Sequence, residues 1–215
     1  MYFIYILQFL AITSSFIVSL RLVNNTSIPK YMSGFYWYNF LAFLVILFGV
    51  LSIFYFEWLI GYALAVNNFT SIFHLGFISI FIQRVTPNLT KVQTDFLNLF
   101  RMLMVVIILY FLITNNSFKQ ANLAFSLVNF TLLIYSIIYF IQIFKGVPNL
   151  DLLKTPSFWI NTGVFFSSSL LIPVCTAYDL LPVSYFFHSR ILLNIALIFP
   201  FIIFHCFLIK AFLCS

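Results

Sequence analysis

Charged residues are scarce in this chain. Lys, Arg, Asp and Glu together make up 7% of its 215 residues, whereas hydrophobic residues make up 64%. A soluble domain usually carries about 25% charged residues, because its surface has to be hydrated. So few charges cannot cover a water-facing surface, which excludes an ordinary soluble enzyme or binding domain. The composition fits a protein whose outer surface faces lipid and whose backbone is hydrogen-bonded within helices.

Cysteine and acidic residues are also few, and their positions exclude several kinds of site. The three cysteines have no CxxC spacing and no metal-type partners, so neither a disulfide framework nor a zinc site is expected. No Asp or Glu falls inside a long apolar stretch, which disfavours an ion-coupled pump. Catalytic motifs such as GxSxG and HExxH are absent. We therefore expect no enzyme activity, no metal and no cofactor.

Long apolar stretches dominate what is present. A helix needs about 20 apolar residues to cross the hydrocarbon core of a bilayer, and seven stretches qualify. Short polar or proline-containing breaks separate them, so sequential helices are expected to be antiparallel neighbours. We predict an all-α, polytopic transmembrane bundle of seven helices that forms a single domain over residues 1–215. The predicted helices cover approximately residues 2–20, 35–55, 58–82, 96–114, 121–144, 158–177 and 187–213.

The basic residues predict the orientation of this bundle. With seven spans, Lys119 and Arg190 fall on one side of the membrane, and the other eight of the ten basic residues fall on the side of the C-terminus. The positive-inside rule then places the N-terminus outside and the C-terminus inside. We interpret the net charge of +6 as a topology signal and expect no nucleic-acid partner. The eight residues are Arg21, Lys30, Arg84, Lys91, Arg101, Lys145, Lys154 and Lys210. The expected location is the bacterial inner membrane, with the mitochondrial inner membrane as the alternative.

Polar residues recur within the spans at helical spacing and predict a partly polar interior. Asn67, Ser71 and His74 share one face of the third span. The fifth and sixth spans each carry a polar or small residue at every seventh position. Polar groups inside lipid usually face the interior of a bundle. The candidate residues for a polar interior or ligand site are Asn67, Ser71, His74, Asn129, Asn161, Ser168, Asn194 and His205.

Two interpretations of these residues stay open. They can act as hydrogen-bonding contacts between helices, each contributing about 0.6 to 2 kcal/mol. Alternatively, some of them line a small ligand site or a water-filled cavity. His74 and His205 are the strongest candidates for such a role, since both are expected in the inner half of the bilayer. There they could meet across the bundle or sense protonation.

A second group of charged residues is expected at the outer surface. Glu57, Asp179, His188 and Arg190 all fall near ends of predicted spans on that side. Charged residues commonly anchor helix ends at the membrane interface. The alternative is that these four residues form the mouth of a site for an external ligand.

Four short features resemble a known family. Glu57 precedes the third span, Asn67-Asn68 and His74 lie within it, the segment 158–163 (FWINTG) opens the sixth, and the segment 188–194 (HSRILLN) opens the seventh. Over about residues 36–213, this succession resembles small bacterial seven-helix membrane proteins. The resemblance implies a sensor-type module of the kind often found beside histidine kinases, without implying a ligand. Because the chain ends just past the seventh span, no output domain is expected, and a signal would pass to a protein partner.

Three functions are therefore compatible with the sequence. The first is a sensory or receptor-like membrane module without its own output domain, which acts through a partner in the membrane or at its inner face. The second is a structural or accessory subunit of a larger membrane complex of the respiratory, secretion or organelle-encoded kind. The third is a small transporter or channel. A small-molecule ligand of unknown identity is compatible with the first and third functions.

Overall fold

Long α-helices make up almost all of the structure, a computed structural model that describes residues 2–23, 32–54, 60–114, 122–146, 151–180 and 186–214. The helices contain 22 to 28 residues, which is about 33–42 Å at 1.5 Å per residue and enough to cross a bilayer core. In chain order they are α1 (Tyr2–Val23), α2 (Ser33–Phe54), α3 (Ile60–Val85), α4 (Lys91–Thr114), α5 (Asn122–Gly146), α6 (Pro156–Leu180) and α7 (Phe186–Leu213), with a short 3₁₀-helix, η3 (Leu152–Lys154), before α6.

Five of the described helices are both long and apolar enough to cross a membrane, namely α2, α4, α5, α6 and α7. The described part of α1 contributes a shorter apolar stretch, Ile6–Leu20. Helix α3 is 26 residues long and carries the polar residues Asn68, Ser71 and His74. The all-helical prediction is confirmed, and five such helices are typical of a multi-pass membrane protein.

The predicted helix boundaries differ from the observed ones by at most three residues, except at the start of α4. This helix begins at Lys91, five residues before the predicted start at residue 96. Thr90 and Gln93 cap it reciprocally: the Thr90 N–H donates to Gln93 Oε1 (3.0 Å), and the Gln93 N–H donates to Thr90 Oγ1 (3.2 Å). Such a capping box stabilises a polar first turn. The prediction was wrong here because it followed the apolar run alone.

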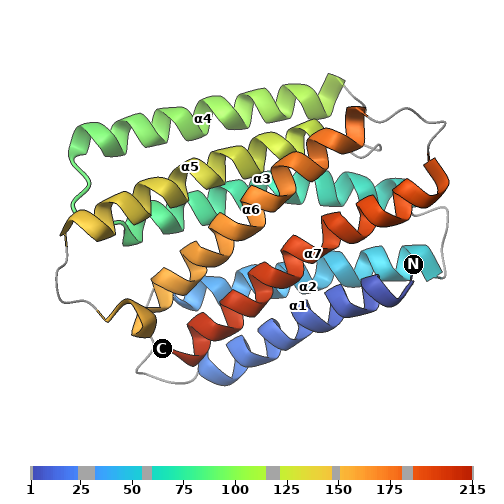
Figure 1. The fold of residues 1–215 in the computed structure, drawn as a ribbon, viewed down its shortest axis with the longest axis horizontal. Helices are drawn as coiled ribbons and strands as arrows, with labels where there is room; N and C mark the ends of the chain where they lie inside the picture. Colours follow the sequence, from blue (N-terminus) through green and yellow to red (C-terminus); the bar gives the residue numbers. More distant parts are fainter. Residues whose placement is uncertain are drawn as a thin grey trace.

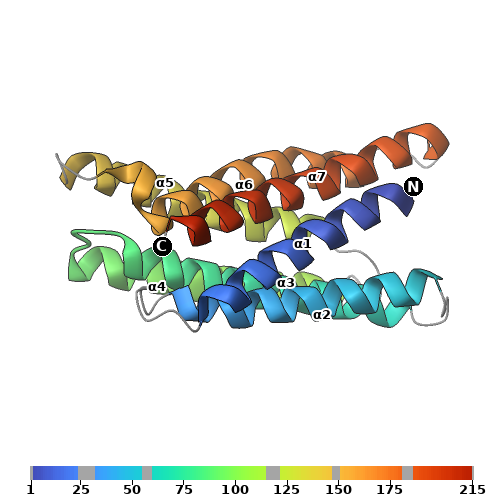
Figure 2. The same ribbon diagram turned by 90° about the horizontal axis from the view of Figure 1, so that it is seen from below.

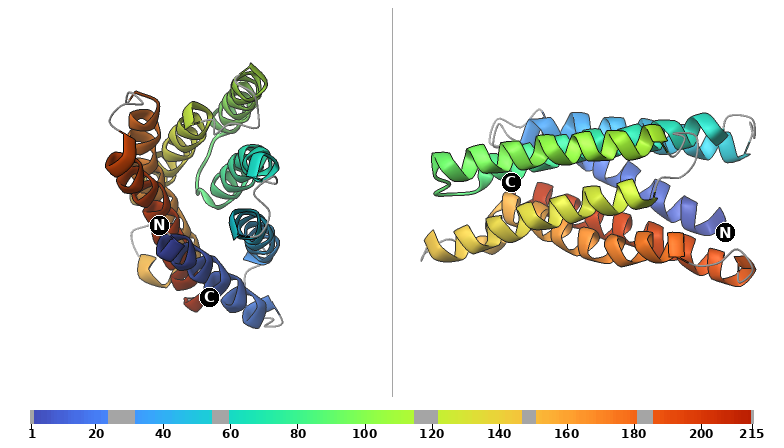
Figure 3. Two further views of the ribbon diagram at one scale, coloured as in Figure 1. Left: turned by 90° about the vertical axis from the view of Figure 1, so that its right-hand side faces the viewer. Right: turned by 90° about the horizontal axis from the view of Figure 1, so that it is seen from above.

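The helices form two layers. The first contains α5, α6 and α7, and the second contains α2, α3 and α4 (Figure 2). At one edge, α1 runs obliquely and packs against α7 of the first layer and α2 of the second. At the other edge, α4 packs against α3 and α5 (Figure 3). The two termini lie at opposite ends of the bundle (Figure 1).

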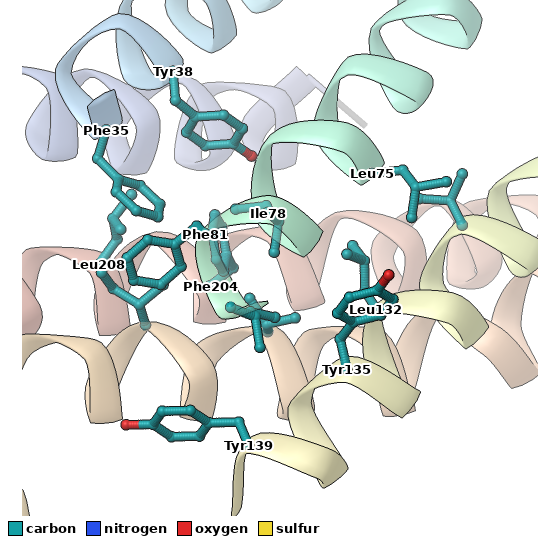
Figure 4. Close-up of a cluster of buried hydrophobic side chains, with 14 of the residues drawn as sticks. Phe35, Tyr38, Leu75, Ile78, Phe81, Leu132, Tyr135, Tyr139, Phe204 and Leu208 are labelled. Atoms are coloured by element: carbon teal, nitrogen blue, oxygen red, sulfur yellow. The ribbon is translucent and has the colours of Figure 1, made fainter. Parts of the chain in front are cut away.

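A hydrophobic core fills the space between the layers. Leu75 and Ile78 of α3 belong to the same buried cluster as Leu132 of α5 and Leu208 of α7 (Figure 4). The outward face of α4 is also apolar but exposed. The exposed fraction of the residues on this face is 70% for Leu99, 65% for Met102, 63% for Val106 and 73% for Ile113. Such a continuous apolar surface is unusual for a protein in water and ordinary for one in lipid.

Candidate functional site

His205 lies where α1, α2 and α7 meet. Its side chain is buried, and its Nδ1 atom lies 2.8 Å from the hydroxyl of Ser15 on α1. Ser15 Oγ also lies 2.9 Å from the carbonyl oxygen of Ile12 and 3.5 Å from Oδ1 of Asn39 on α2. Asn39 completes the group by donating from Nδ2 to the Ser15 carbonyl at 3.5 Å. Three buried polar side chains from three helices therefore form one connected group.

The hydrogen-bonding capacity of Ser15 favours one tautomer of His205. A hydroxyl carries a single hydrogen, so Ser15 cannot donate to both Ile12 and His205. Both short contacts are satisfied when His205 carries its proton on Nδ1 and donates to Ser15 Oγ, while Ser15 donates to the Ile12 carbonyl. This assignment is inferred from the hydrogen-bond network. It makes His205 a donor toward α1.

His74 forms a second hydrogen bond between helices. Its Nδ1 atom lies 2.6 Å from the hydroxyl of Tyr38 on α2. The Tyr38 ring is buried and stacks on Phe77 of α3, with ring centroids 5.2 Å apart. Tyr38 and Asn39 are consecutive residues of α2. Both histidines are thus connected to the same turn of α2, His74 directly and His205 through Ser15 of α1.

Phe204 lies next to both histidines. The centroid of its buried ring is 6.0 Å from that of His74 and 5.4 Å from that of its sequence neighbour His205. The Tyr38 ring meets Phe204 edge-on at 6.2 Å, and Figure 4 shows both side chains in the buried cluster. The structure therefore brings the two predicted histidines into one region. We call this region the histidine centre; it consists of Ser15, Tyr38, Asn39, His74, Phe204 and His205.

The predicted residues of α5 and α6 lie along a separate seam. Ser168 donates to Asn129 Oδ1 at 3.3 Å, and the Asn129 amide donates to a carbonyl of its own helix at 2.8 Å. Asn161 is fully buried and likewise donates to its own helix at 2.8 Å. Its Oδ1 and the Oγ of Ser136 have no hydrogen-bond partner among the described residues. These contacts join two neighbouring helices of one layer, away from the histidine centre.

Ser71, another predicted interior residue, is buried and donates to the Asn68 carbonyl one turn earlier in α3, at 2.5 Å. A serine hydroxyl that is satisfied by its own helix is common in apolar surroundings. Asn67 lies on α3 and Asn194 on α7, and both side chains are outside the described part.

The predicted outer cluster is described only at the level of the backbone. Asp179 lies near the end of α6, while His188 and Arg190 lie in the first turns of α7. These two helix ends share one end of the bundle (Figure 1). Glu57 lies outside the described residues, as do the side chains of the other three.

Gly163 sets the distance between α6 and α7. A Cβ atom at this position would lie 2.8 Å from Cβ of Phe207 and 3.3 Å from Cδ2 of Phe204. The Phe207 ring stacks on Trp159 at 5.9 Å, and Nζ of Lys210 lies 5.7 Å from the centroid of Trp159. The segment 158–163 therefore packs directly against α7. It holds the part of α7 that carries Phe204 and His205.

The sequence pattern does not single out the partners of the histidines. Tyr38 resembles an ordinary interfacial aromatic residue, and Ser15 is a small residue in an apolar span. Asn39 did carry a usable signal, because it is the only amide in the predicted span 35–55. An amide inside lipid is costly unless it is hydrogen-bonded.

In the described part of the chain, no group of three or more His, Cys, Asp or Glu residues comes together. The histidine centre offers two imidazoles, two hydroxyls and one amide, which can exchange protons and hydrogen bonds with one another. The chain matches no protein-family model, no curated protein and no solved structure, so its function has to be argued from this geometry.

Proposed function

We propose that this chain is a seven-span membrane protein that acts as a sensory or receptor-like module through a protein partner. Its N-terminus lies outside and its C-terminus inside, as the distribution of basic residues indicates. The histidine centre is the observation that carries the proposal. There, two imidazoles form hydrogen bonds between different helices, His205 with α1 and His74 with α2.

A change in the protonation of His74 would act directly on a helix contact. His205 already donates from Nδ1, so a proton added at its Nε2 would act by placing a charge among buried groups. A neutral imidazole has one donor and one acceptor nitrogen, whereas a protonated imidazole has two donors. The hydroxyl of Tyr38 can donate to a neutral His74, but it would have to accept from a protonated one. Since this bond joins α2 to α3, a new donor alters the contact between them. Histidine serves as a switch between about pH 5 and pH 8 in this manner.

The surroundings of the histidines make a protonated imidazole costly, so its formation would put the helix contacts under strain. His205 contacts Ser15 of α1, which in turn contacts Asn39 of α2, while His74 contacts Tyr38 of α2 and Phe204 of α7. No described carboxylate forms an ion pair with either imidazole. A positive charge on one imidazole would meet hydroxyl, amide and aromatic groups and, across Phe204, the other imidazole. Because a buried and unpaired charge is costly, the helices would gain by rearranging around it.

The test is hydrogen exchange of the full chain in lipid nanodiscs at about pH 8 and about pH 4, corrected for the intrinsic pH dependence of exchange. We expect faster exchange in α1 and α2 at the lower pH. His74→Gln and His205→Gln should each reduce this response. The control is Ser168→Ala, which removes a buried hydroxyl from the α5–α6 seam and should leave the response unchanged.

Co-purification from the native membrane tests the partner. A sensory module should retain a signalling protein at its inner face. If exchange is the same at both pH values and no signalling protein is retained, the proposal fails. Retention of many subunits of one stable complex would favour the accessory-subunit alternative.

A further inference from the structure

A second polar group lies away from the histidine centre, where α3 ends and α4 begins. A cavity of about 420 Å³ opens there, within the range of about 300 to 1,000 Å³ that is typical of small-molecule sites. Two arginines, three uncharged polar residues and two aliphatic residues line it. They are Ile80, Gln83, Arg84, Leu89, Thr94, Asn98 and Arg101.

Arg101 is held in place by neutral groups. Its Nη2 donates to Oδ1 of Asn98 at 2.7 Å, and its Nη1 donates to Oε1 of Gln83 at 3.3 Å. Gln83 is fixed in turn by donating from Nε2 to the Thr94 carbonyl at 3.3 Å. A guanidinium has five N–H donors, so these two bonds leave donors for a ligand. The charge of Arg101 is oriented by its partners without being neutralised.

Arg84 adds a second positive charge to the same cavity. Its side chain is exposed, and no described group accepts a hydrogen bond from it. Neither Arg84 nor Arg101 forms an ion pair with a described carboxylate, and Asp95 on α4 is exposed and likewise unpaired. The cavity therefore combines two uncompensated cations with fixed amide groups.

Both arginines lie where the apolar part of the bundle gives way to polar residues. The twelve residues of α4 that follow Arg101, 102–113, contain no charge. On α3, the residues just before Gln83 are apolar apart from Ser79. In a bilayer, Arg84 near the end of α3 lies close to the level of the polar headgroups, and the long side chain of Arg101 can extend from α4 toward the same level. Ile80 and Leu89 supply the apolar wall that the glycerol and acyl parts of a lipid require.

The whole end of the bundle around this cavity is basic. The ends of α3, α5 and α7 and the start of α4 lie together there, at the end that holds the C-terminus (Figure 3). Only two acidic residues, Asp95 and Asp151, accompany the basic ones in the described part of this end. The basic residues are Arg84, Lys91, Arg101, Lys145, Lys154 and Lys210. Such an excess attracts an anionic membrane surface.

We propose that Arg84 and Arg101 bind the phosphate of an anionic lipid headgroup. Phosphate oxygens accept charge-assisted hydrogen bonds from guanidinium groups, often two at a time. A free phosphate ion has the same recognition chemistry. The position of the cavity at the end of the apolar part of the bundle and its aliphatic lining residues favour the lipid as the source of the phosphate.

The experiment is native mass spectrometry of the detergent-solubilised full chain, titrated with phosphatidylglycerol or with zwitterionic phosphatidylcholine. We expect the chain to bind phosphatidylglycerol more tightly. Arg84→Gln combined with Arg101→Gln should weaken this binding by about tenfold or more, because charge-assisted bonds are lost. The matched control is Lys91→Gln combined with Lys145→Gln, which removes the same charge from exposed positions at the same end and should preserve the preference.

A single variant separates loss of binding from loss of folding. Arg84 makes no hydrogen bond to the described protein, so Arg84→Gln should leave folding intact and still weaken lipid binding.

A parallel titration with inorganic phosphate identifies whether the bound phosphate belongs to a lipid or is free in solution. If inorganic phosphate competes with the lipid, and if this competition requires both arginines, the result would support the phosphate site and assign soluble phosphate as its ligand. An equal loss in the arginine and lysine variants, or equal binding of the two lipids, would overturn the proposal.

Discussion

The close approach of α6 and α7 at Gly163 leads to a quantitative prediction. In Gly163→Ala, the new Cβ would lie 2.8 Å from Cβ of Phe207, closer than the 3.0 Å below which real Cβ contacts are essentially never found. Neither atom is at the end of a flexible side chain, so the two helix backbones have to move apart. Overpacking of this kind costs about 1 to 3 kcal/mol.

A second effect of the same substitution has the opposite sign. Alanine is favoured over glycine inside a helix by about 1 kcal/mol, which offsets part of the cost. Gly76 on α3 provides the matched control, because a Cβ there meets nothing within 4 Å. Gly76→Ala should therefore show the gain in helix propensity alone. The difference between the two variants isolates the cost of the contact, about 1 to 3 kcal/mol.

Reversible unfolding in mixed micelles, followed by circular dichroism as the fraction of denaturing detergent rises, measures this difference. In a background where Trp37 and Trp58 are replaced by Phe, the fluorescence of Trp159 gives a local signal, since its ring stacks on Phe207. We expect Gly163→Ala to unfold at a lower detergent fraction than Gly76→Ala. Equal unfolding midpoints would refute the packing that we describe between α6 and α7.

Three smaller predictions concern individual hydrogen bonds. Tyr38→Phe keeps the packed ring but removes the bond to His74, so the free energy of unfolding should fall by about 1 kcal/mol, as detergent unfolding would measure. Tyr135→Phe removes the bond from the Tyr135 hydroxyl to a carbonyl of α4 at 2.6 Å, with a similar expected loss of about 1 kcal/mol in the same assay; unchanged midpoints would contradict either reading. The carboxylate of Asp151 accepts a 2.7 Å bond from Lys154 and raises the pKa of that lysine. This contribution to stability is complete below the ordinary lysine pKa of 10.5 and is lost as pH rises through the raised value. Asp151→Asn should return the pKa to its ordinary value in an NMR titration without a measurable change in stability, because both side chains are exposed.

The positions of the helices could be predicted from the sequence, but their partners could not. Apolar runs locate each helix because lipid permits few other structures. Packing is different, since an apolar surface faces lipid and a neighbouring helix equally well. In the structure, α3 packs more extensively against α5 than against its sequence neighbour α4, and α1 packs against α7. The prediction that sequential helices are antiparallel neighbours therefore gives the order of the helices. It does not give their arrangement in two layers.

The candidate site was predictable to a similar extent. His74 and His205 could be selected because an imidazole in an apolar span needs a partner. The identity of that partner depends on which helices meet, and Ser15 is 190 residues away from His205 in the chain. Ser71 is also a polar residue in an apolar span, but its hydroxyl donates to a carbonyl of its own helix and needs no partner from another helix. Sequence spacing does not distinguish these two outcomes.

The two-layer arrangement makes the histidine centre mechanically distinct from the other polar contacts. Within the first layer, α6 and α7 are held by the steric contact at Gly163, and α5 and α6 share the seam of Asn129 and Ser168. Neither contact contains a titratable side chain. The centre instead lies at the edge where α1 connects α7 to α2. A change in its protonation should therefore move α2 relative to α7 while the spacing of α6 and α7 stays fixed. Distance measurements between spin labels on α2 and α7, and on α6 and α7, would separate these motions. Equal shifts in both pairs would indicate general loosening of the bundle and would contradict a role for the histidines as a switch between layers.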